Sequence, residues 1–559
     1  MKHKIKNNKL LIFILAFVIS ITTTCLWFNL RTRITPPEVN QNIYIPKVLK
    51  DNDSSFSIGK NSLKKNKFGL WEMYIEGKPY ERGLIIGKLS QKLIIDQEDA
   101  FVEQLQKLIP SHLQIKLIGV FIKWFNRDLD KYIDNEYLQE IYGISQYAST
   151  QYNFVGNNYF RMLNYHAAHD VGHAIQQYHL AACTSLAAWG KKSKDSNIII
   201  GRNFDFYVGE KFAEEKIIAF IKPDKGYPFA YVTWGGMMGV VSGMNIQGLT
   251  ITINAGKSKI PFSAKTPVSL LARKVLQYAG NIKEAEEILK TGETFVCESF
   301  LIGSAEEGKC ILIEKSPQKI AVFQPDTGSI VVTNHFQSKE FEFDIYNNEA
   351  IKDGASSERF FRVKELLQQK SKIGLSDIVS ILRDYKGFGN KDIGLGNEKT
   401  INQFIAHHSV IFQPAKRIFW VSSQPWQMGS FVAYDLNKIF SSKTDTFFYS
   451  DELTIAADTF LSGISFSNLK FFRSFGKTIL KAIDNNQRLA KPMLEKFIAS
   501  NPNYYEGYFY LAKYYESNKD YSNAMINYNF ALSKVIPNLK EEEIIKEFKN
   551  KCEIKNNKK

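Results

Sequence analysis

Residues 181–207 read AACTSLAAWGKKSKDSNIIIGRNFDFY, which sets one cysteine, Cys183, ahead of a compact Gly-Arg-Asn-Phe-Asp cluster. A thiol is a good nucleophile only when a base removes its proton. One such base is the cysteine's own α-amino group, whose pKa of roughly 7.7–8.0 suits proton transfer near neutral pH. That amine is free only if the bond between Ala182 and Cys183 is cut. The stretch therefore indicates a self-processing site that makes Cys183 a chain terminus.

Four further blocks accompany this stretch in a fixed order. WEMYIEGKPYERGLIIGKL precedes it, and GMNIQGLTITINAG, VVTNHF and SSERFFRV follow it, so that the set covers about residues 70–425. Together the blocks resemble N-terminal nucleophile (Ntn) hydrolases, in particular the autoproteolytic acyltransferases typified by isopenicillin N acyltransferase, with choloylglycine hydrolase and acid ceramidase as relatives. The resemblance implies an α+β fold, a four-layer αββα sandwich. The sequence differs from the family pattern at Ala182, because the acyltransferase branch usually has Gly before its cysteine. Ala is also small, so self-cleavage is still compatible with this residue.

The resemblance also implies roles for the residues around the cysteine. Cys183 would be the nucleophile, with its freed amine as base. Arg202 would lie near the thiolate and favour its ionised form, and Asp205 would hold the α-ammonium through a charge-assisted hydrogen bond. Without the resemblance, Arg202 and Asp205 read as an ordinary surface ion pair.

Three later residues complete the expected site. By resemblance, Asn254 would point its amide NH2 at the developing oxyanion, Asn334 would orient the nucleophile amine or the substrate, and Arg359 would brace the site or meet a polar substrate group. On their own, the two asparagines read as turn formers and the arginine as a solvated helix residue. We favour the catalytic interpretation for all three.

The implied reaction is hydrolysis or transfer of an acyl group at a linear amide through a Cys183 thioester. Water as acceptor makes the enzyme an amidohydrolase, and an amine makes it an N-acyltransferase; the sequence does not choose between them. We expect a small acylated amine as substrate. A fatty-acyl chain fits the aromatic content of 13%, although a large core also explains that content.

Two alternatives stay open. One is a non-catalytic, membrane-tethered interaction scaffold whose C-terminal tail recruits a protein partner. The other is a thiol hydrolase that works as an intact chain with a histidine such as His335 as base. Competing signatures are missing from the sequence, which contains no GxSxG, GxxxxGK[ST] or GxGxxG motif. We therefore expect no cofactor.

The histidines and cysteines do not indicate a metal site. His166, His169 and His173 share one helical face but have no HExxH-type carboxylate beside them, so we expect a structural role. The number of cysteines, five, is odd, and no two of them form a CxxC pair, which argues against a disulfide framework and against a cysteine zinc site. A Cys297–Cys310 bridge stays open, but we favour two small buried hydrophobes.

The N-terminus predicts membrane attachment. A basic leader (1–9) precedes an uncharged, largely apolar run (10–28) that as a helix would reach about 28 Å, enough to cross a bilayer core. We favour an uncleaved anchor over a removed signal peptide, with the leader cytoplasmic and the catalytic domain on the extracytoplasmic side. Residues 29–69 are polar and show no regular apolar pattern, which predicts a linker.

The net charge of +15 does not indicate nucleic-acid binding. Part of this charge lies at the chain ends, and no nucleic-acid-binding motif accompanies it, so we expect no nucleic-acid partner.

The remaining chain predicts one catalytic domain over 70–450 and a helical tail over 451–559. Helical periodicity dominates 89–180, and β-rich runs take over after Cys183, interrupted by helical patterns at about 267–289 and 356–369. The spacing of a tetratricopeptide repeat (TPR) occurs in the tail at Tyr508, Leu511, Ala512, Tyr515, Ala524, Tyr528 and Ala531. A lone repeat cannot bury its own face, so we expect it to pack on another tail helix, on the catalytic domain or on a partner.

Overall fold

Two β-sheets form the centre of the protein in the computed structural model, which describes residues 2–108, 111–175, 181–206, 209–257, 259, 261–441 and 447–557. In the order of their pairing, the larger sheet contains β1 (Leu49–Asn52), β2 (Ser55–Ile58), β3 (Asn61–Lys65), β4 (Trp71–Gly77), β7 (Ile217–Pro223), β8 (Phe229–Thr233), β9 (Ser242–Asn245), β10 (Leu249–Gly256), β11 (Cys297–Ser304), β12 (Lys309–Lys315) and β13 (Ile320–Phe323). The smaller sheet contains β14 (Ser329–Val332), β5 (Ala181–Ala188), β6 (Ile199–Phe206), β15 (His408–Gln413), β16 (Ile418–Ser422), β17 (Phe431–Asp435) and β18 (Tyr449–Ile455).

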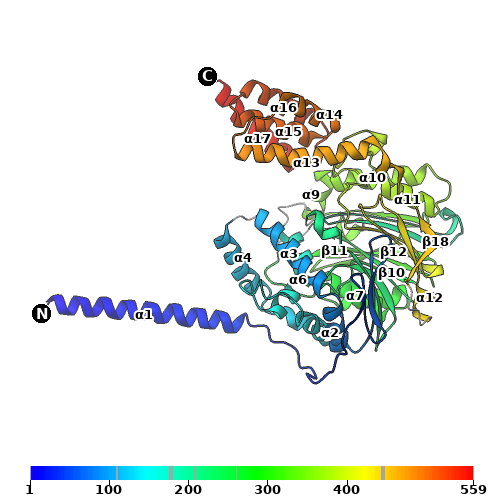
Figure 1. The fold of residues 1–559 in the computed structure, drawn as a ribbon, viewed down its shortest axis with the longest axis horizontal. Coiled ribbons are helices and arrows are strands. Elements are labelled where there is room, and N and C mark those ends of the chain that lie inside the picture. The colour runs from blue at the N-terminus through cyan, green and yellow to red at the C-terminus, as the bar shows by residue number, and fades with distance from the viewer. Residues whose placement is uncertain are drawn as a thin grey trace.

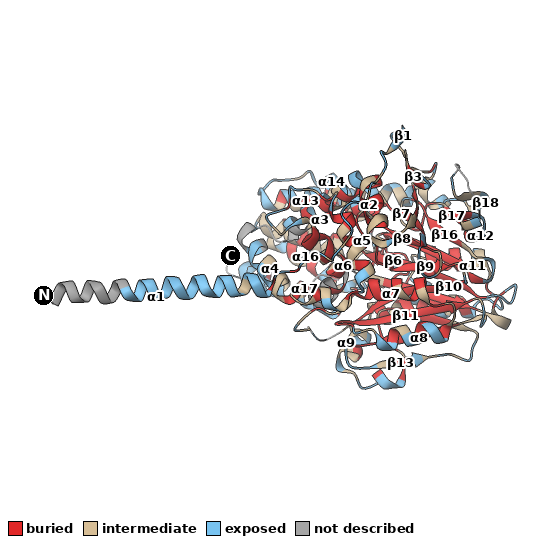
Figure 2. Ribbon diagram, turned by 90° about the horizontal axis from the view of Figure 1, so that it is seen from below, coloured by how far each residue is buried: buried red, intermediate tan, exposed pale blue. Residues whose placement is uncertain are grey.

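The two sheets pack face to face and helices cover both outer faces (Figures 1 and 2). Between the sheets lies an apolar layer that includes Ile200, Phe220 and Leu312. The outer face of the larger sheet packs on α2 (Pro79–Leu89), α5 (Asn135–Ser145), α6 (Asn158–Ile175), α7 (Val268–Tyr278) and α8 (Ile282–Thr291). The outer face of the smaller sheet packs on α10 (Ala355–Gln368) and α11 (Leu375–Arg383). The layer order is therefore helix, sheet, sheet, helix, as the resemblance implied.

The expected linker is the main difference from the sequence prediction. Residues 49–65 form β1, β2 and β3, which extend the larger sheet from β4. Ile58 and Leu63 point inward and are buried, and Gly59, with a φ of +59°, turns the chain between β2 and β3. The domain also runs past its predicted end at 450, because β18 pairs with β17 as far as Ile455.

Helix α2 packs closely against α5. A Cβ atom added at Gly83 would lie 2.1 Å from the backbone oxygen of Glu140, so only glycine fits. Side by side, the two helices bring Arg82 and Glu140 together. Helices α3 (Gln91–Leu108) and α4 (His112–Phe125) complete this predominantly helical region.

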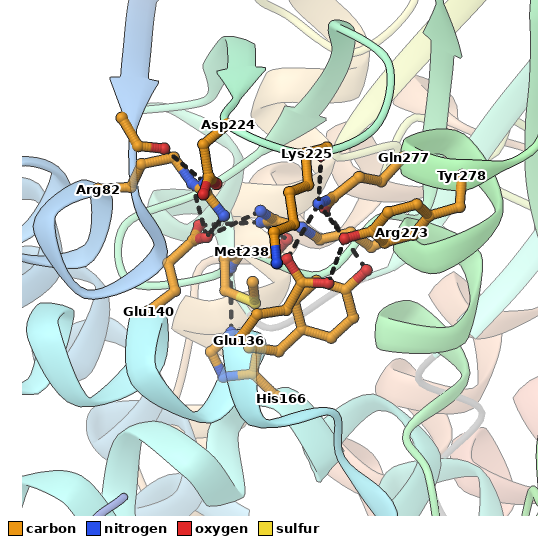
Figure 3. A network of polar contacts seen from close by, with 12 residues as sticks. Arg82, Glu136, Glu140, His166, Asp224, Lys225, Met238, Arg273, Gln277 and Tyr278 are labelled. Carbon is orange, nitrogen blue, oxygen red and sulfur yellow. Dashed lines mark hydrogen bonds and ion pairs between the residues drawn. The ribbon is translucent and has the colours of Figure 1, made fainter. Parts of the chain in front are cut away.

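A buried ion cluster joins the region before Cys183 to the region after it (Figure 3). Glu140 Oε2 accepts from Arg82 Nη2 and from Arg273 Nη2, both at 2.9 Å, and Glu140 Oε1 accepts from Arg273 Nη1 at 3.0 Å. All three side chains are fully buried. Burial alone would raise the pKa of Glu140, but the charges of Arg273 and Arg82 outweigh it and hold the pKa below its ordinary value. Strand β4, which pairs in parallel with β7, makes the same connection through the backbone.

Helix α1 (Lys2–Arg31) projects away from the body (Figure 1). In the part of the chain that the structure describes, Ile12–Arg31 is the one helical segment that is long and apolar enough to cross a membrane. Its mean hydropathy is 2.0, and none of its most apolar stretch is buried in the protein. At its end the ring of Trp27 lies 5.7 Å from that of Trp124, and Arg31 forms an ion pair with Asp128 at 2.8 Å. Helix α1 is thus attached to the body beside α4.

The C-terminal tail is a set of helices docked on the catalytic domain (Figure 1): α13 (Ile464–Asp484), α14 (Lys491–Ser500), α15 (Tyr505–Ser517), α16 (Tyr521–Ser533) and α17 (Leu539–Asn556). Helices α15 and α16 form the predicted hairpin, with Ala512, Ala524 and Tyr528 buried in it. Leu469 of α13 packs on Phe404 and Met428 of the domain. The tail buries its apolar face against its own helices and the domain.

The two central cysteines do not form a bridge. Cys310 pairs with Gly303 in the β11–β12 register, whereas Cys297 begins β11, six residues away. At about 3.4 Å per residue this separates the cysteines by roughly 20 Å, far beyond the Cα separation of a disulfide. Both are buried, which agrees with the favoured prediction.

Candidate active site

Cys183 lies on β5, and its side chain is almost fully buried. Its register partner on β6 is Phe204, and Ala182 pairs with Asp205. The bond proposed for cleavage is therefore inside a paired strand. Because side chains alternate along a strand, Cys183 and Arg202 face the larger sheet, whereas Asp205 faces the helices over the smaller one.

Arg202 is held beside the sulfur by the larger sheet. Its Nη2 donates to Cys183 Sγ at 3.4 Å and also to the backbone oxygen of Ile253. Its Nη1 donates to the backbone oxygen of Val241 at 3.0 Å and to Ser242 Oγ. With this many fixed acceptors, the guanidinium supplies a positive charge at a constant position near the thiol.

The backbone of Cys183 has two further partners from the predicted set. Its N–H donates to Asn334 Oδ1 at 3.0 Å. Arg359 Nη1 donates to its carbonyl oxygen at 2.6 Å and to Thr184 Oγ1 at 2.9 Å, and Arg359 Nη2 donates to Asn334 Oδ1 at 2.8 Å. Sulfur, nitrogen and carbonyl oxygen of one residue are thus each held by a different side chain.

Asp205 is buried, and neither carboxylate oxygen has a hydrogen-bond partner within the described residues. Burial raises its pKa to about 7, and the charges of Arg359 and Arg202 only partly oppose this rise. A buried carboxylate without a donor is costly. Asp205 can therefore accept a hydrogen bond from a donor that the described residues do not provide.

The thiol is protonated at neutral pH in the uncut chain. Burial raises the pKa of Cys183 to about 11, although Arg202 opposes the rise. His335 does not act on this thiol in the structure, because its Nδ1 contacts Ser356 Oγ at 2.8 Å and Thr333 Oγ1 at 3.1 Å. Burial also lowers the pKa of His335 to about 4. The intact-chain alternative with His335 as base thus lacks a contact between base and nucleophile.

Asn254, on β10, lies opposite Ser185, which is the next residue of β5 after Cys183 that faces the larger sheet. Its Oδ1 accepts from Ser185 Oγ at 2.8 Å, and its Nδ2 donates to the backbone oxygen of Val332 at 3.3 Å. The second bond is longer than the usual 2.9–3.0 Å. The structure places Asn254 beside the site without a contact to Cys183.

Glu298 of β11 is a neighbour of the site that the sequence did not reveal. Its side chain is fully buried, and its oxygens have no hydrogen-bond partner among the residues described. Burial raises its pKa well above the ordinary value, Asp170 raises it further, and Arg202 opposes the rise. The residue stands inside an ordinary strand, CESFLIGS, so only its spatial neighbours distinguish it.

A second unpredicted feature is a chain of polar contacts that leads away from Arg202. Ser242 Oγ contacts His408 Nε2 at 2.9 Å, and His408 Nδ1 contacts His407 Nδ1 at 2.8 Å. Burial lowers the pKa of both histidines well below its ordinary value. Both are therefore neutral, and they orient Ser242 rather than add charge near Arg202.

The histidine set of α6 takes no part in the site as far as the structure describes it. His166 Nδ1 contacts the backbone oxygen of Met162 at 2.7 Å, and its Nε2 accepts from the backbone N–H of Met238 at 3.0 Å. These contacts are structural, as predicted. The side chains of His169 and His173 lie outside the described residues. Within the described part of the chain, no group of three or more His, Cys, Asp or Glu residues could hold a metal ion.

The comparison with known families relates part of the chain to acyltransferases. The family described as acyl-coenzyme A:6-aminopenicillanic acid acyl-transferase matches residues 190–424. This match confirms the resemblance drawn from the ordered sequence blocks. It begins at residue 190, so it does not extend to Cys183.

Among curated proteins, an uncharacterized protein of Archaeoglobus fulgidus is 26% identical over 275 residues, which are 45% of this chain and 45% of that protein. Protein dcd1A of Dictyostelium discoideum is 22% identical over 289 residues, 47% of this chain and 62% of that protein. The chain thus spans about half the length of the curated relatives it matches.

Solved structures with some similarity include an acid amidase and a bile acid hydrolase. One is a Caenorhabditis elegans ortholog of N-acylethanolamine-hydrolyzing acid amidase, 17% identical, with a TM-score of 0.31, covering 42% of this chain and 93% of that one. The other is a mutant of conjugated bile acid hydrolase from Clostridium perfringens, also 17% identical, with a TM-score of 0.32, covering 46% of this chain and 92% of that one.

Proposed function

We propose that the protein is an amide hydrolase or N-acyltransferase that uses Cys183 as its nucleophile after cleavage of the bond between Ala182 and Cys183. The observation that carries the proposal is the set of contacts on one residue: Arg202 at the sulfur, Asn334 at the nitrogen and Arg359 at the carbonyl oxygen. A buried structural cysteine has no need of three such partners.

In the activation step the thiol of Cys183 attacks the carbonyl carbon of Ala182. The C–S bond forms, the C–N bond breaks, and the departing nitrogen takes the thiol proton. Water then hydrolyses the thioester, which leaves a carboxylate on Ala182 and restores the thiol beside the α-amine freed in the first step. Asn334 Oδ1, already 3.0 Å from that nitrogen, keeps the new amine in place.

The unpartnered carboxylate of Asp205 supports the activation step. Cleavage creates an α-amine beside the position where Ala182 pairs with Asp205, and this amine becomes an ammonium when it takes a proton. An ammonium within hydrogen-bond distance favours the ionised carboxylate and offsets the cost of its burial. Cleavage thus supplies the cation that Asp205 lacks in the uncut chain.

In the catalytic cycle the α-amine removes the thiol proton, and the sulfur attacks the carbonyl carbon of the substrate amide. We propose that Asn254 donates its NH2 to the oxyanion, because its present bond to Val332 is long and a charged oxygen is a stronger acceptor. The amine product leaves with the proton, and water or a second amine then cleaves the thioester. Arg202 favours the thiolate as nucleophile and as leaving group.

We also propose that the enzyme is anchored to a membrane by α1, with the catalytic domain on the extracytoplasmic side. Lysines at positions 2, 4, 6 and 9 favour a cytoplasmic N-terminus. Beside the base of α1, α4 exposes Leu117, Val120 and Phe121, with exposed fractions of 61%, 49% and 52%. Spaced three and four residues apart, they form one apolar face that fits the surface of the bilayer.

The decisive assay compares wild-type protein with Cys183→Ala on N-acyl amino acids, bile-acid conjugates and β-lactam amides, with and without an added amine acceptor. We expect the wild type to release the amine and Cys183→Ala to release none. Activity that survives in Cys183→Ala would show that the nucleophile is wrongly assigned. Absence of amidase activity in every wild-type preparation would favour the interaction-scaffold alternative.

A further inference from the structure

A cavity of about 550 Å³ lies between the catalytic domain and tail helix α13. Phe206, at the end of β6, and Trp426 line it from the domain, and Phe466 lines it from α13. Helix α13 crosses this end of the domain (Figure 1). The tail is therefore one wall of a cavity whose other wall includes the last residue of the strand that carries Arg202 and Asp205.

Four cations line the cavity from one face of α13: Lys470, Arg473, Lys477 and Lys481. Their spacing of three or four residues keeps them on a single helix face. Glu214 is the one carboxylate in the described lining. The cavity therefore carries an excess of positive charge beside its aromatic residues.

Packing positions two of these cations. Lys470 Nζ lies 4.6 Å from the ring centre of Phe466. The guanidinium of Arg473 lies 4.8 Å from the ring centre of Trp426, and its Nη2 donates to the backbone oxygen of Phe404 at 2.9 Å. These contacts hold this face of α13 against the domain. The cavity therefore combines aromatic rings with positive charges, which suits an amphiphilic ligand with an anionic end.

The cavity is close to the nucleophile. Phe206 is two residues beyond Phe204, the register partner of Cys183, which is about 7 Å along the strand. The rings of Phe204 and Phe206 stack at 5.6 Å, and the guanidinium of Arg202 lies 4.5 Å from the Phe204 ring. The cavity wall thus begins two positions along β6 from the register partner of Cys183.

We propose that this cavity binds the anionic group of the substrate and that α13 is part of the substrate-binding site. The inference rests on the proposed function and specifies its substrate as an acylated amine that carries a carboxylate or phosphate. The four cations lie outside residues 190–424, the range matched by the family. They are therefore a feature of this chain's tail.

The test compares Lys470→Gln/Lys481→Gln with wild type on substrates that share one acyl chain: an N-acylglycine, an N-acyl phosphoethanolamine and the neutral N-acylethanolamine. Loss of two partly screened ion pairs should raise KM for the anionic substrates by about 5- to 30-fold, with kcat changed less. KM for the neutral substrate should change by less than about twofold, since it has no charge to lose. A larger rise for the phosphate or for the carboxylate identifies the preferred group.

Two controls separate a charge effect from a folding effect. Lys496→Gln removes a lysine on the neighbouring helix α14, outside the cavity lining, and should leave every KM unchanged. Lys470→Arg/Lys481→Arg keeps the charge and should retain the wild-type KM. Equal KM changes for charged and neutral substrates, or no change in either, would overturn the proposal.

Binding of the N-acylglycine to uncut Cys183→Ala, measured by calorimetry, keeps this test independent of catalysis. We expect binding that weakens by a similar factor in the double glutamine background. If the wild type cleaves no amide but this charge-dependent binding is present, the proposed function fails and the cavity assignment stands. If amides are cleaved without discrimination by charge, the function stands and the cavity assignment fails.

Discussion

The buried cluster of Glu140, Arg82 and Arg273 should hold the two halves of the processed protein together (Figure 3). Replacement of Glu140 by Gln leaves two buried guanidinium groups without their shared carboxylate. Removal of one partner from a buried pair costs about 3–5 kcal/mol. We expect the lower half of this range, because Arg82 keeps Asp224 at 3.0 Å and Arg273 keeps the backbone oxygen of Met238 at 3.0 Å.

For a cooperative unit of about 400 residues, an unfolding entropy of about 2.1 cal/mol/K per residue converts this loss to a Tm decrease of about 3.5–5 °C. Calorimetry on full-length protein measures it. Because Glu140 lies before the proposed cut and Arg273 after it, size-exclusion chromatography in urea should also show earlier release of the fragment covering residues 1–182.

Glu136→Gln on the same helix is the matched control. Glu136 accepts from Gln277 Nε2 at 3.0 Å and Tyr278 OH at 2.7 Å but is only partly buried, so its loss should cost less than about 1.5 kcal/mol. A Tm of Glu140→Gln equal to that of the wild type, or a larger decrease for Glu136→Gln, would refute the reasoning.

Three further predictions follow from the site and the anchor. In the uncut Cys183→Ala variant, folding raises the pKa of Asp205 to about 7, so the folded state holds a proton on Asp205 more tightly than the unfolded state does. Stability should therefore fall as the pH rises from about 4 to 7. Measurements of Tm against pH should show that Asp205→Asn removes this contribution. Asn254→Ala should lower kcat by about 10²–10³ with little change in KM, and a decrease of less than threefold would exclude an oxyanion role. Deletion of residues 1–31 should leave residual binding to phospholipid vesicles that Leu117→Asp/Phe121→Asp abolishes in sedimentation assays; equal binding with and without the aspartates would contradict a membrane contact of α4.

Much of the fold could be predicted because its strands carry a strong local signal. Runs such as LTITINAG coincide with β10, since β-branched residues in a sheet buried on both faces leave a continuous apolar pattern. The hairpins of residues 49–65 were missed because short, polar edge strands have little apolar content, and their stability comes from pairing with β4. The helical hairpin of α15 and α16 was visible in its spacing, but its docking through Leu469 depends on residues distant in sequence.

The site could be predicted only through the resemblance to a family. Cys183, Arg202, Asn334 and Arg359 come together in space as that resemblance implied, although they span more than 170 residues of sequence. Glu298 could not be found in this way, because nothing in a strand sequence indicates that a glutamate is buried beside the site. The cationic face of α13 was equally hidden, since lysines three or four residues apart on a helix usually face solvent.

The most direct test of the account is the N-terminal sequence and intact mass of the chains in a folded, active preparation of the full-length protein. The account predicts a chain that begins Cys-Thr-Ser-Leu-Ala-Ala-Trp at Cys183 and stays associated with the fragment that ends at Ala182. It also predicts only uncut chain from Cys183→Ala. An active preparation that contains only the uncut chain would contradict the claim that activity depends on the α-amine of Cys183.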